Sequence, residues 1–136
     1  MYLKETLGCA LPDKEEQSAV IVGRDVVSGL PIEMEISSSV VYEAIKDNLN
    51  SICNSIKMIL EKTPPELAKD IIHSGIYITG GSSKIRKLDE LFSQITNIKV
   101  NTCELPEESA VRGLNKIVSD EQFRKLAFSM QARIYK

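Results

Sequence analysis

The residues best suited to chemistry form one short run, Thr79-Gly80-Gly81-Ser82-Ser83, at the end of an apolar, β-branched segment over 76–79. Two glycines at the carboxyl end of a strand leave no Cβ between the backbone and a ligand, and the amides that open the next helix are free to bind an anion. Nucleotides are held in this way. The spacing matches neither the phosphate loop Gly-x-x-x-x-Gly-Lys nor the dinucleotide fingerprint. From spacing alone, the glycine pair predicts either a ligand-binding turn or an ordinary tight turn.

The other reactive residue types do not form a catalytic set. His73 stands near the end of a predicted helix, where histidine commonly complements the helix dipole, and no Ser-Asp pair can be assigned to it. A small hydrolase that uses His73 and a cysteine is kept only as a further alternative. Cysteines occur at three distant positions, and neighbouring carboxylates occur in three pairs whose side chains diverge. We therefore predict reduced thiols, no zinc site and a solvated acidic surface. These residues are Cys9, Cys53, Cys103, Glu15-Glu16, Asp89-Glu90 and Glu107-Glu108.

Length and composition restrict the function classes. The chain has 136 residues, 43% of them hydrophobic and 26% charged, as expected for one soluble domain or two small ones. A net charge of -2 gives no basic field for binding nucleic acid. No apolar run approaches the roughly 20 residues of a membrane-spanning helix, and the first residues lack the regions of a secretory signal. We therefore predict a cytoplasmic protein that binds no nucleic acid and does not insert into a membrane.

A hairpin and a long helix are predicted in the first half of the chain. Strand-like runs over 18–22 and 31–36 flank Ser28-Gly29, and in the second run apolar residues alternate with glutamates. The serines at 37–39 can cap a helix, and apolar residues at three- and four-residue spacing continue to Leu60. Thr63-Pro64-Pro65-Glu66 then predicts a capping box for a second helix, which Gly75 ends.

Strands and helices alternate in the second half. The pattern predicts a strand over 76–79, a helix over 85–95, a strand over 98–102, a helix over 110–118 and a final helix from about Asp120 to Ile134. The final helix carries basic residues beside its apolar stripe, which is compatible with a membrane surface, although packing on the domain is favoured. These basic residues are Arg124, Lys125, Arg133 and Lys136. The chain is thus predicted to be α/β, with a boundary near Gly75.

Three stretches, in order, resemble the MreB/Mbl family of bacterial actin homologues. They are GRDVVSGLP over 23–31, EKTPPELAKDII over 61–72 and GIYITGG over 75–81, within a likeness that runs from about Leu3 to Val118. The resemblance implies part of the actin-like ATPase fold, namely the C-terminal part of its second lobe. Residues 1–74 would form the small outer subdomain, with a remnant linking segment at 1–12. Residues 75–136 would form the second half of the large inner subdomain.

The resemblance also implies an adenosine site. In this superfamily the Thr-Gly-Gly stretch packs on base and ribose, a role that falls on Thr79, Gly80, Gly81, Ser82 and Ser83, and a pocket lysine matches Lys4. Family members carry glycine where this chain has Ser82 and Lys87. The implied cofactor is ATP, with magnesium bound only in the complete protein. No catalytic or metal-binding residue is predicted in the chain itself.

These features predict a fragment of an ATP-binding, filament-forming cytoskeletal protein that determines bacterial cell shape. The family's phosphate and magnesium motifs belong to segments that this chain lacks, so we expect no ATP hydrolysis by these residues alone. The family's membrane anchors lie in the missing lobe too, so membrane contact would come through that lobe or an adaptor protein. An open sheet edge favours self-association. The alternative is a stand-alone interaction module without nucleotide function, which the departures at Ser82 and Lys87 favour.

Overall fold

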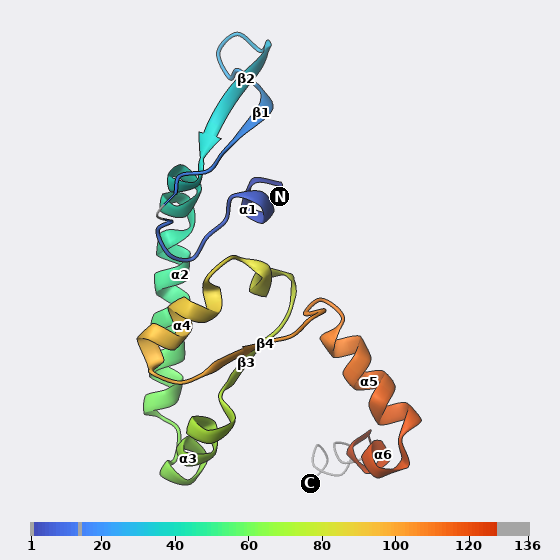
Figure 1. Cartoon of the computed structure of the whole chain (residues 1–136). Helices are drawn as coiled ribbons and strands as arrows, with labels where there is room; N and C mark the ends of the chain where they lie inside the picture. Colours follow the sequence, from blue (N-terminus) through green and yellow to red (C-terminus); the bar gives the residue numbers. More distant parts are fainter. Residues whose placement is uncertain (1, 14, 128–136) are drawn as a thin grey trace, which may run out of the picture.

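The computed structural model describes residues 2–13 and 15–127, which form an elongated arrangement of helices and two small sheets (Figure 1). The hairpin projects from one end of the long helix α2, and the C-terminal helices stand on the far side of the second sheet (Figure 1). In chain order the elements are α1 (Tyr2–Thr6), β1 (Ser18–Arg24), β2 (Pro31–Ser37), α2 (Ser38–Glu61), α3 (Pro65–Ser74), β3 (Ile76–Ile78), the 3-10 helix η1 (Gly81–Lys84), α4 (Leu88–Thr96), β4 (Val100–Thr102), α5 (Ser109–Ser119) and α6 (Glu121–Ala127).

The predicted hairpin and long helix are confirmed. Strands β1 and β2 pair antiparallel, with Ser18 opposite Ser37 and Arg24 opposite Pro31. Helix α2 follows β2 without a loop, and Ser37 takes the predicted N-cap position, but the predicted hydroxyl cap is not made. The hydroxyl of Ser37 forms a 2.8 Å hydrogen bond with the hydroxyl of Ser39 and makes no capping hydrogen bond to the first-turn amides of α2. The backbone amide of Ser38 instead donates to the Gln17 carbonyl at 2.7 Å, which ties the start of the helix to the chain entering β1.

The predicted capping box of the second helix is also wrong. Helix α3 begins at Pro65, so Pro64 takes the N-cap position, and proline has no hydroxyl with which to cap. The Thr63 hydroxyl turns back and donates to the Ile59 carbonyl at 2.8 Å in the last turn of α2. At the other end Gly75 terminates α3 as predicted, with φ of 82° and its amide bonded to the Ile71 carbonyl at 2.8 Å.

The alternating second half is confirmed, with shifted boundaries. Strands β3 and β4 are parallel, with Ile76 opposite Val100, and each is shorter than predicted. The helix predicted over 85–95 begins only at Leu88, because Lys87 has a left-handed backbone (φ 58°) that interrupts helical geometry. The final predicted helix begins at Glu121. Its continuation, with Met130, Arg133, Ile134 and Lys136, falls beyond the described residues, as does the side chain of Lys125.

Helix α1 was not predicted. Its five residues lead directly into the most deeply buried part of the chain, where Leu7, Cys9 and Ala10 are each no more than 2% exposed. Gly8 is required in this segment, since a Cβ there would lie 2.1 Å from the Lys4 carbonyl oxygen. The stretch read from sequence as a linking segment is therefore an integral part of the packed structure.

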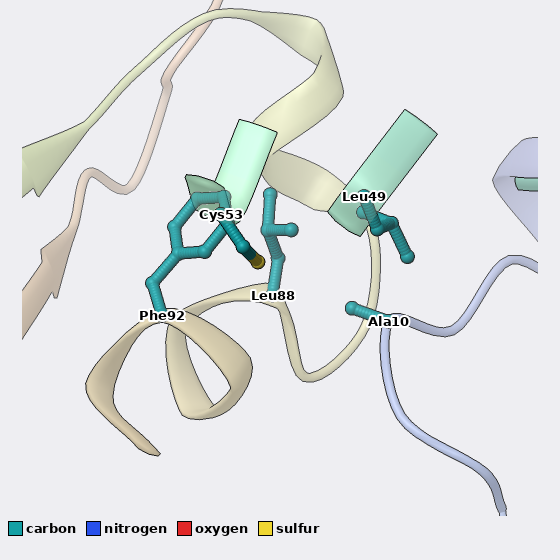
Figure 2. Close-up of a cluster of buried hydrophobic side chains, with 5 residues drawn as sticks. All are labelled: Ala10, Leu49, Cys53, Leu88 and Phe92. Carbon is teal, nitrogen blue, oxygen red and sulfur yellow. The ribbon is translucent and has the colours of Figure 1, made fainter. Parts of the chain in front are cut away.

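The hydrophobic core joins α2, α4 and the N-terminal segment. Figure 2 shows Phe92 and Leu88 of α4 against Cys53 and Leu49 of α2, with Ala10 closing one side. All five side chains are buried. The apolar periodicity of α2 thus serves mainly to receive α4. Within the described part of the chain, no helix is long and apolar enough to cross a lipid bilayer.

Candidate functional site

The predicted site lies beside a pocket of about 490 Å³ between α1 and the turn that follows β3. One wall comes from the N-terminal helix and the other from the glycine turn, with one residue from the segment after β4. The lining residues are Lys4, Glu5, Gly81, Ser82, Lys84, Ile85 and Glu107. Segments separated by more than 70 residues in sequence therefore share one cavity.

The glycine turn is built by backbone geometry and one hydroxyl. Gly80 has φ of 86°, a left-handed conformation that favours glycine, and its amide donates to the Pro106 carbonyl at 2.8 Å. The Ser83 hydroxyl donates to the Gly80 carbonyl at 2.7 Å, which closes the turn from inside. Gly80 and Ser83 therefore shape the turn without lining the pocket, and Thr79 lies on the exposed surface before it.

The structure brings the predicted Lys4 to the predicted Ser82. The Lys4 ammonium donates to the Ser82 hydroxyl at 3.4 Å across the pocket. Gly81 lies next to this pair, and a Cβ there would stand 3.6 Å from the Glu107 carboxylate. Of the six predicted site residues, Lys4, Gly81 and Ser82 thus line one cavity, whereas Thr79, Gly80 and Ser83 do not.

Four pocket residues were missed, and Glu107 is the most informative of them. It was interpreted as solvated surface, and it is exposed, but it also forms a 2.7 Å ion pair with Lys84 at the rim of the pocket. The hydrogen bond from the Gly80 amide to the Pro106 carbonyl holds the neighbouring Glu107 at the pocket. A usable signal was present, because the carboxyl ends of adjacent parallel strands meet at one sheet edge, where ligands bind in α/β folds. The other missed residues are Glu5, Lys84 and Ile85.

The remaining candidates lie away from this pocket. His73 is exposed in the last turn of α3. The three cysteines are free; Cys9 and Cys53 are buried and Cys103 is half-buried. Burial raises the pKa of the Cys53 thiol, which opposes formation of the thiolate that a nucleophile needs. Among residues 2–13 and 15–127, no three or more His, Cys, Asp or Glu side chains gather as a metal site would require.

An ion-pair cluster that sequence reasoning missed involves the two residues that follow the pocket residue Ile85 in the chain. The carboxylate of Asp13, with its side chain only 12% exposed, lies 2.5 Å from the Lys87 ammonium and 3.0 Å from the Arg86 guanidinium. The hydrogen bond from Lys87 lowers the pKa of Asp13 although partial burial opposes it, and the same bond raises the pKa of Lys87. Both groups are therefore charged at neutral pH. Lys87 makes this ion pair from a left-handed backbone position, where the family resemblance predicts glycine.

Comparison with known proteins gives a consistent result. The sequence model of the family described as MreB/Mbl protein matches residues 1–126. The chain is 36% identical to the cell shape-determining protein Mbl of Bacillus subtilis over 82% of its own length and 33% of that protein. It is 34% identical to the cell shape-determining protein MreB of Escherichia coli K12, over 84% of the chain and 33% of the relative. The chain thus spans about a third of the length of these relatives.

Solved structures agree with the sequence matches. MreB5 of Spiroplasma citri bound to ADP superimposes with a TM-score of 0.81 at 31% identity, over 93% of this chain and 38% of that protein. The same protein bound to AMPPNP gives a TM-score of 0.80 at 31% identity, over 93% and 37% of the two chains. The shared structure covers nearly all of this chain and less than half of the solved one.

Proposed function

Since the chain belongs to the MreB/Mbl family and has part of the actin-like ATPase fold, we propose that it is the adenosine-side portion of a filament-forming, cell shape-determining protein. The observation that carries this proposal is the pocket in which Lys4 meets Ser82 beside the glycine turn. The named relatives determine cell shape, and the solved MreB5 structures hold ADP and AMPPNP.

The lining residues suit the nucleoside end of ATP. Ile85 and the bare backbone of Gly81 offer a surface on which a base can pack. Lys4, Glu5 and Ser82 offer donors and acceptors suited to ribose hydroxyls. We expect no ATP hydrolysis by these 136 residues alone, because phosphoryl transfer requires charge stabilisation around the γ-phosphate that, by the family resemblance, other segments supply together with magnesium. We also propose that residues 1–74 form the small outer subdomain and residues 75–136 half of the large inner one.

Titration with ADP tests the nucleotide site. In amide NMR spectra we expect chemical-shift changes confined to residues 4–5, 79–85 and 107. Lys4→Met should weaken binding about tenfold, because it removes a charged hydrogen-bond donor from the pocket. Lys69→Met, which removes an exposed lysine from α3, is the matched control and should leave the titration unchanged. Absence of shifts at millimolar ADP would reject the site and favour the stand-alone interaction module.

We further propose that the chain associates with itself through apolar surface. Helix α5 exposes Val111, Leu114 and Val118, each more than 60% accessible, and in the described structure the sheet of β3 and β4 has only two strands. Light scattering of the isolated chain should show mass rising above 15.1 kDa with concentration. Leu114→Lys should suppress this rise, whereas Val27→Lys at the exposed hairpin tip should not. A monodisperse monomer throughout the micromolar range would contradict self-association.

The same family membership supports a cytoplasmic place of action. We propose that contact with a membrane is made by other segments of a protein as long as the matched relatives, or by a cell-shape membrane adaptor. Co-purification of a tagged chain with membranes only when such a partner is present would support this arrangement.

A further inference from the structure

Besides the hydrogen bond between Lys4 and Ser82, the two walls of the pocket are connected directly after Ile85. The backbone of Arg86 pairs with Cys9 in an isolated parallel bridge, and the Ala10 amide donates to the Arg86 carbonyl at 2.8 Å. The Arg86 guanidinium also donates to the Leu7 carbonyl at 3.4 Å. Residues 7–10 continue from α1, which carries Lys4 and Glu5, so Arg86 links the wall formed by residues 4–5 to the wall formed by residues 81–85.

Asp13 completes this connection from the other end of the segment. Its carboxylate lies 3.0 Å from the Arg86 guanidinium and 2.5 Å from the Lys87 ammonium. The two basic side chains are each about a third exposed. The Arg86 side chain therefore contacts both Leu7 and Asp13, which lie at the two ends of the segment over 7–13. The Lys87 ammonium donates a charge-assisted hydrogen bond to Asp13 Oδ1, a type of bond stronger than a neutral one, and Arg86 adds an ion pair at Oδ2. Three residues thus hold the N-terminal segment against the turn after the pocket.

We propose that Asp13, Arg86 and Lys87 form a clamp that positions α1, and with it Lys4 and Glu5, against residues 81–85. Asp13 is in this sense a positioning residue for the pocket. Its importance for nucleotide binding rests on the function proposed above, whereas the clamp itself does not. The left-handed backbone of Lys87 supports the proposal, since a strained conformation of a non-glycine residue persists where its surroundings fix it.

The native cysteines allow the clamp to be tested without any ligand. Cys9 is 1% exposed within the clamped segment, and Cys53 is 6% exposed in the core between α2 and α4. Alkylation by N-ethylmaleimide, mapped by mass spectrometry, therefore reports local opening at Cys9 and global unfolding at Cys53. In Asp13→Asn and in Lys87→Met we expect Cys9 to react about tenfold faster, with the Cys53 rate unchanged. Glu15→Gln, which removes a nearby exposed carboxylate, should change neither rate.

Comparing Asp13→Asn with Lys87→Met separates local opening of the segment around Cys9 from a direct electrostatic effect on the Cys9 thiol. Cys9 lies close enough to Asp13 to hydrogen-bond it, and Lys87 acts on both groups. If charge alone governed the thiol, loss of the carboxylate would speed alkylation and loss of the ammonium would slow it. Acceleration in both variants supports the clamp. Opposite changes, no change, or equal acceleration of Cys9 and Cys53 would each overturn it.

Titration of the same variants with ADP links the clamp to the pocket. If wild-type protein binds ADP, Asp13→Asn should bind it more weakly, by about tenfold, and Asp13→Glu should recover part of the affinity. Full affinity in Asp13→Asn would overturn the positioning role. If wild-type protein binds no ADP while Cys9 still responds as expected, the nucleotide function fails and the clamp remains.

Discussion

Replacing Phe92 with alanine is expected to lower the free energy of unfolding by about 3–5 kcal/mol. The Phe92 ring is 5% exposed and packs with Leu88, Leu49 and Cys53 where α4 meets α2 (Figure 2). Removal of the ring loses its transfer free energy and leaves a cavity that two helices cannot readily close. Because domains of this size are stable by only about 5–15 kcal/mol, this loss removes a substantial share of the total free energy of unfolding. Urea denaturation followed by circular dichroism measures the change.

Two further substitutions sharpen this prediction. Phe92→Leu keeps most of the apolar volume and should cost no more than about 1.5 kcal/mol. Val118→Ala, at a 68% exposed position on α5, should shift the free energy by less than about 0.5 kcal/mol. If Phe92→Ala were no more damaging than Val118→Ala, the contact between α2 and α4 would not be the centre of the core.

Periodicity predicted the long elements but missed the short helix α1. Helix α2 contains enough turns for its apolar stripe to stand out, and the alternation of Ile32, Met34 and Ile36 with glutamates identified the hairpin. Helix α1 has five residues, too few for a stripe, and owes its position to the buried segment that follows it. The predicted caps failed because the Ser37 hydroxyl bonds the Ser39 hydroxyl and the Thr63 hydroxyl bonds the Ile59 carbonyl, so neither accepts from a first-turn amide.

The site was predictable where it depends on local chain geometry. The glycine turn follows from sequence, and the family resemblance suggested Lys4, which the structure places at Ser82. For Glu107 the sequence offered only the general signal that the carboxyl ends of parallel strands share a sheet edge, and for Asp13 it offered none, because both positions depend on contacts between distant segments. Glu107 is held by the hydrogen bond from Gly80 to Pro106, and Asp13 by its ion pairs with Arg86 and Lys87. An acidic residue in a polar stretch looks the same in sequence whether it is solvated or clamped.

Replacing Gly75 with alanine is expected to lower the free energy of unfolding by about 2–4 kcal/mol, from two separate causes. With φ of 82° and ψ of 177°, Gly75 lies in a backbone region that is essentially restricted to glycine, at a cost of about 1–3 kcal/mol for another residue. A Cβ there would also stand 2.6 Å from both the Lys99 carbonyl oxygen and the Asn101 side-chain amide. The Lys99 carbonyl accepts the Ile76 amide at 2.8 Å, so relief of the clash should pull β4 away from β3.

The double variant Gly75→Ala with Asn101→Ala separates the causes. It removes one clash but keeps the backbone strain and the contact with Lys99, so it should recover only part of the lost stability. Asn101→Ala alone should cost about 1 kcal/mol, because its amide donates to the Ser74 carbonyl at 3.0 Å. Hydrogen exchange should show the largest loss of protection at Ile76 and Ile78, where β3 pairs with β4. Unchanged protection at these amides, with a stability within about 0.5 kcal/mol of wild type, would mean that the parallel pair tolerates a side chain at this junction.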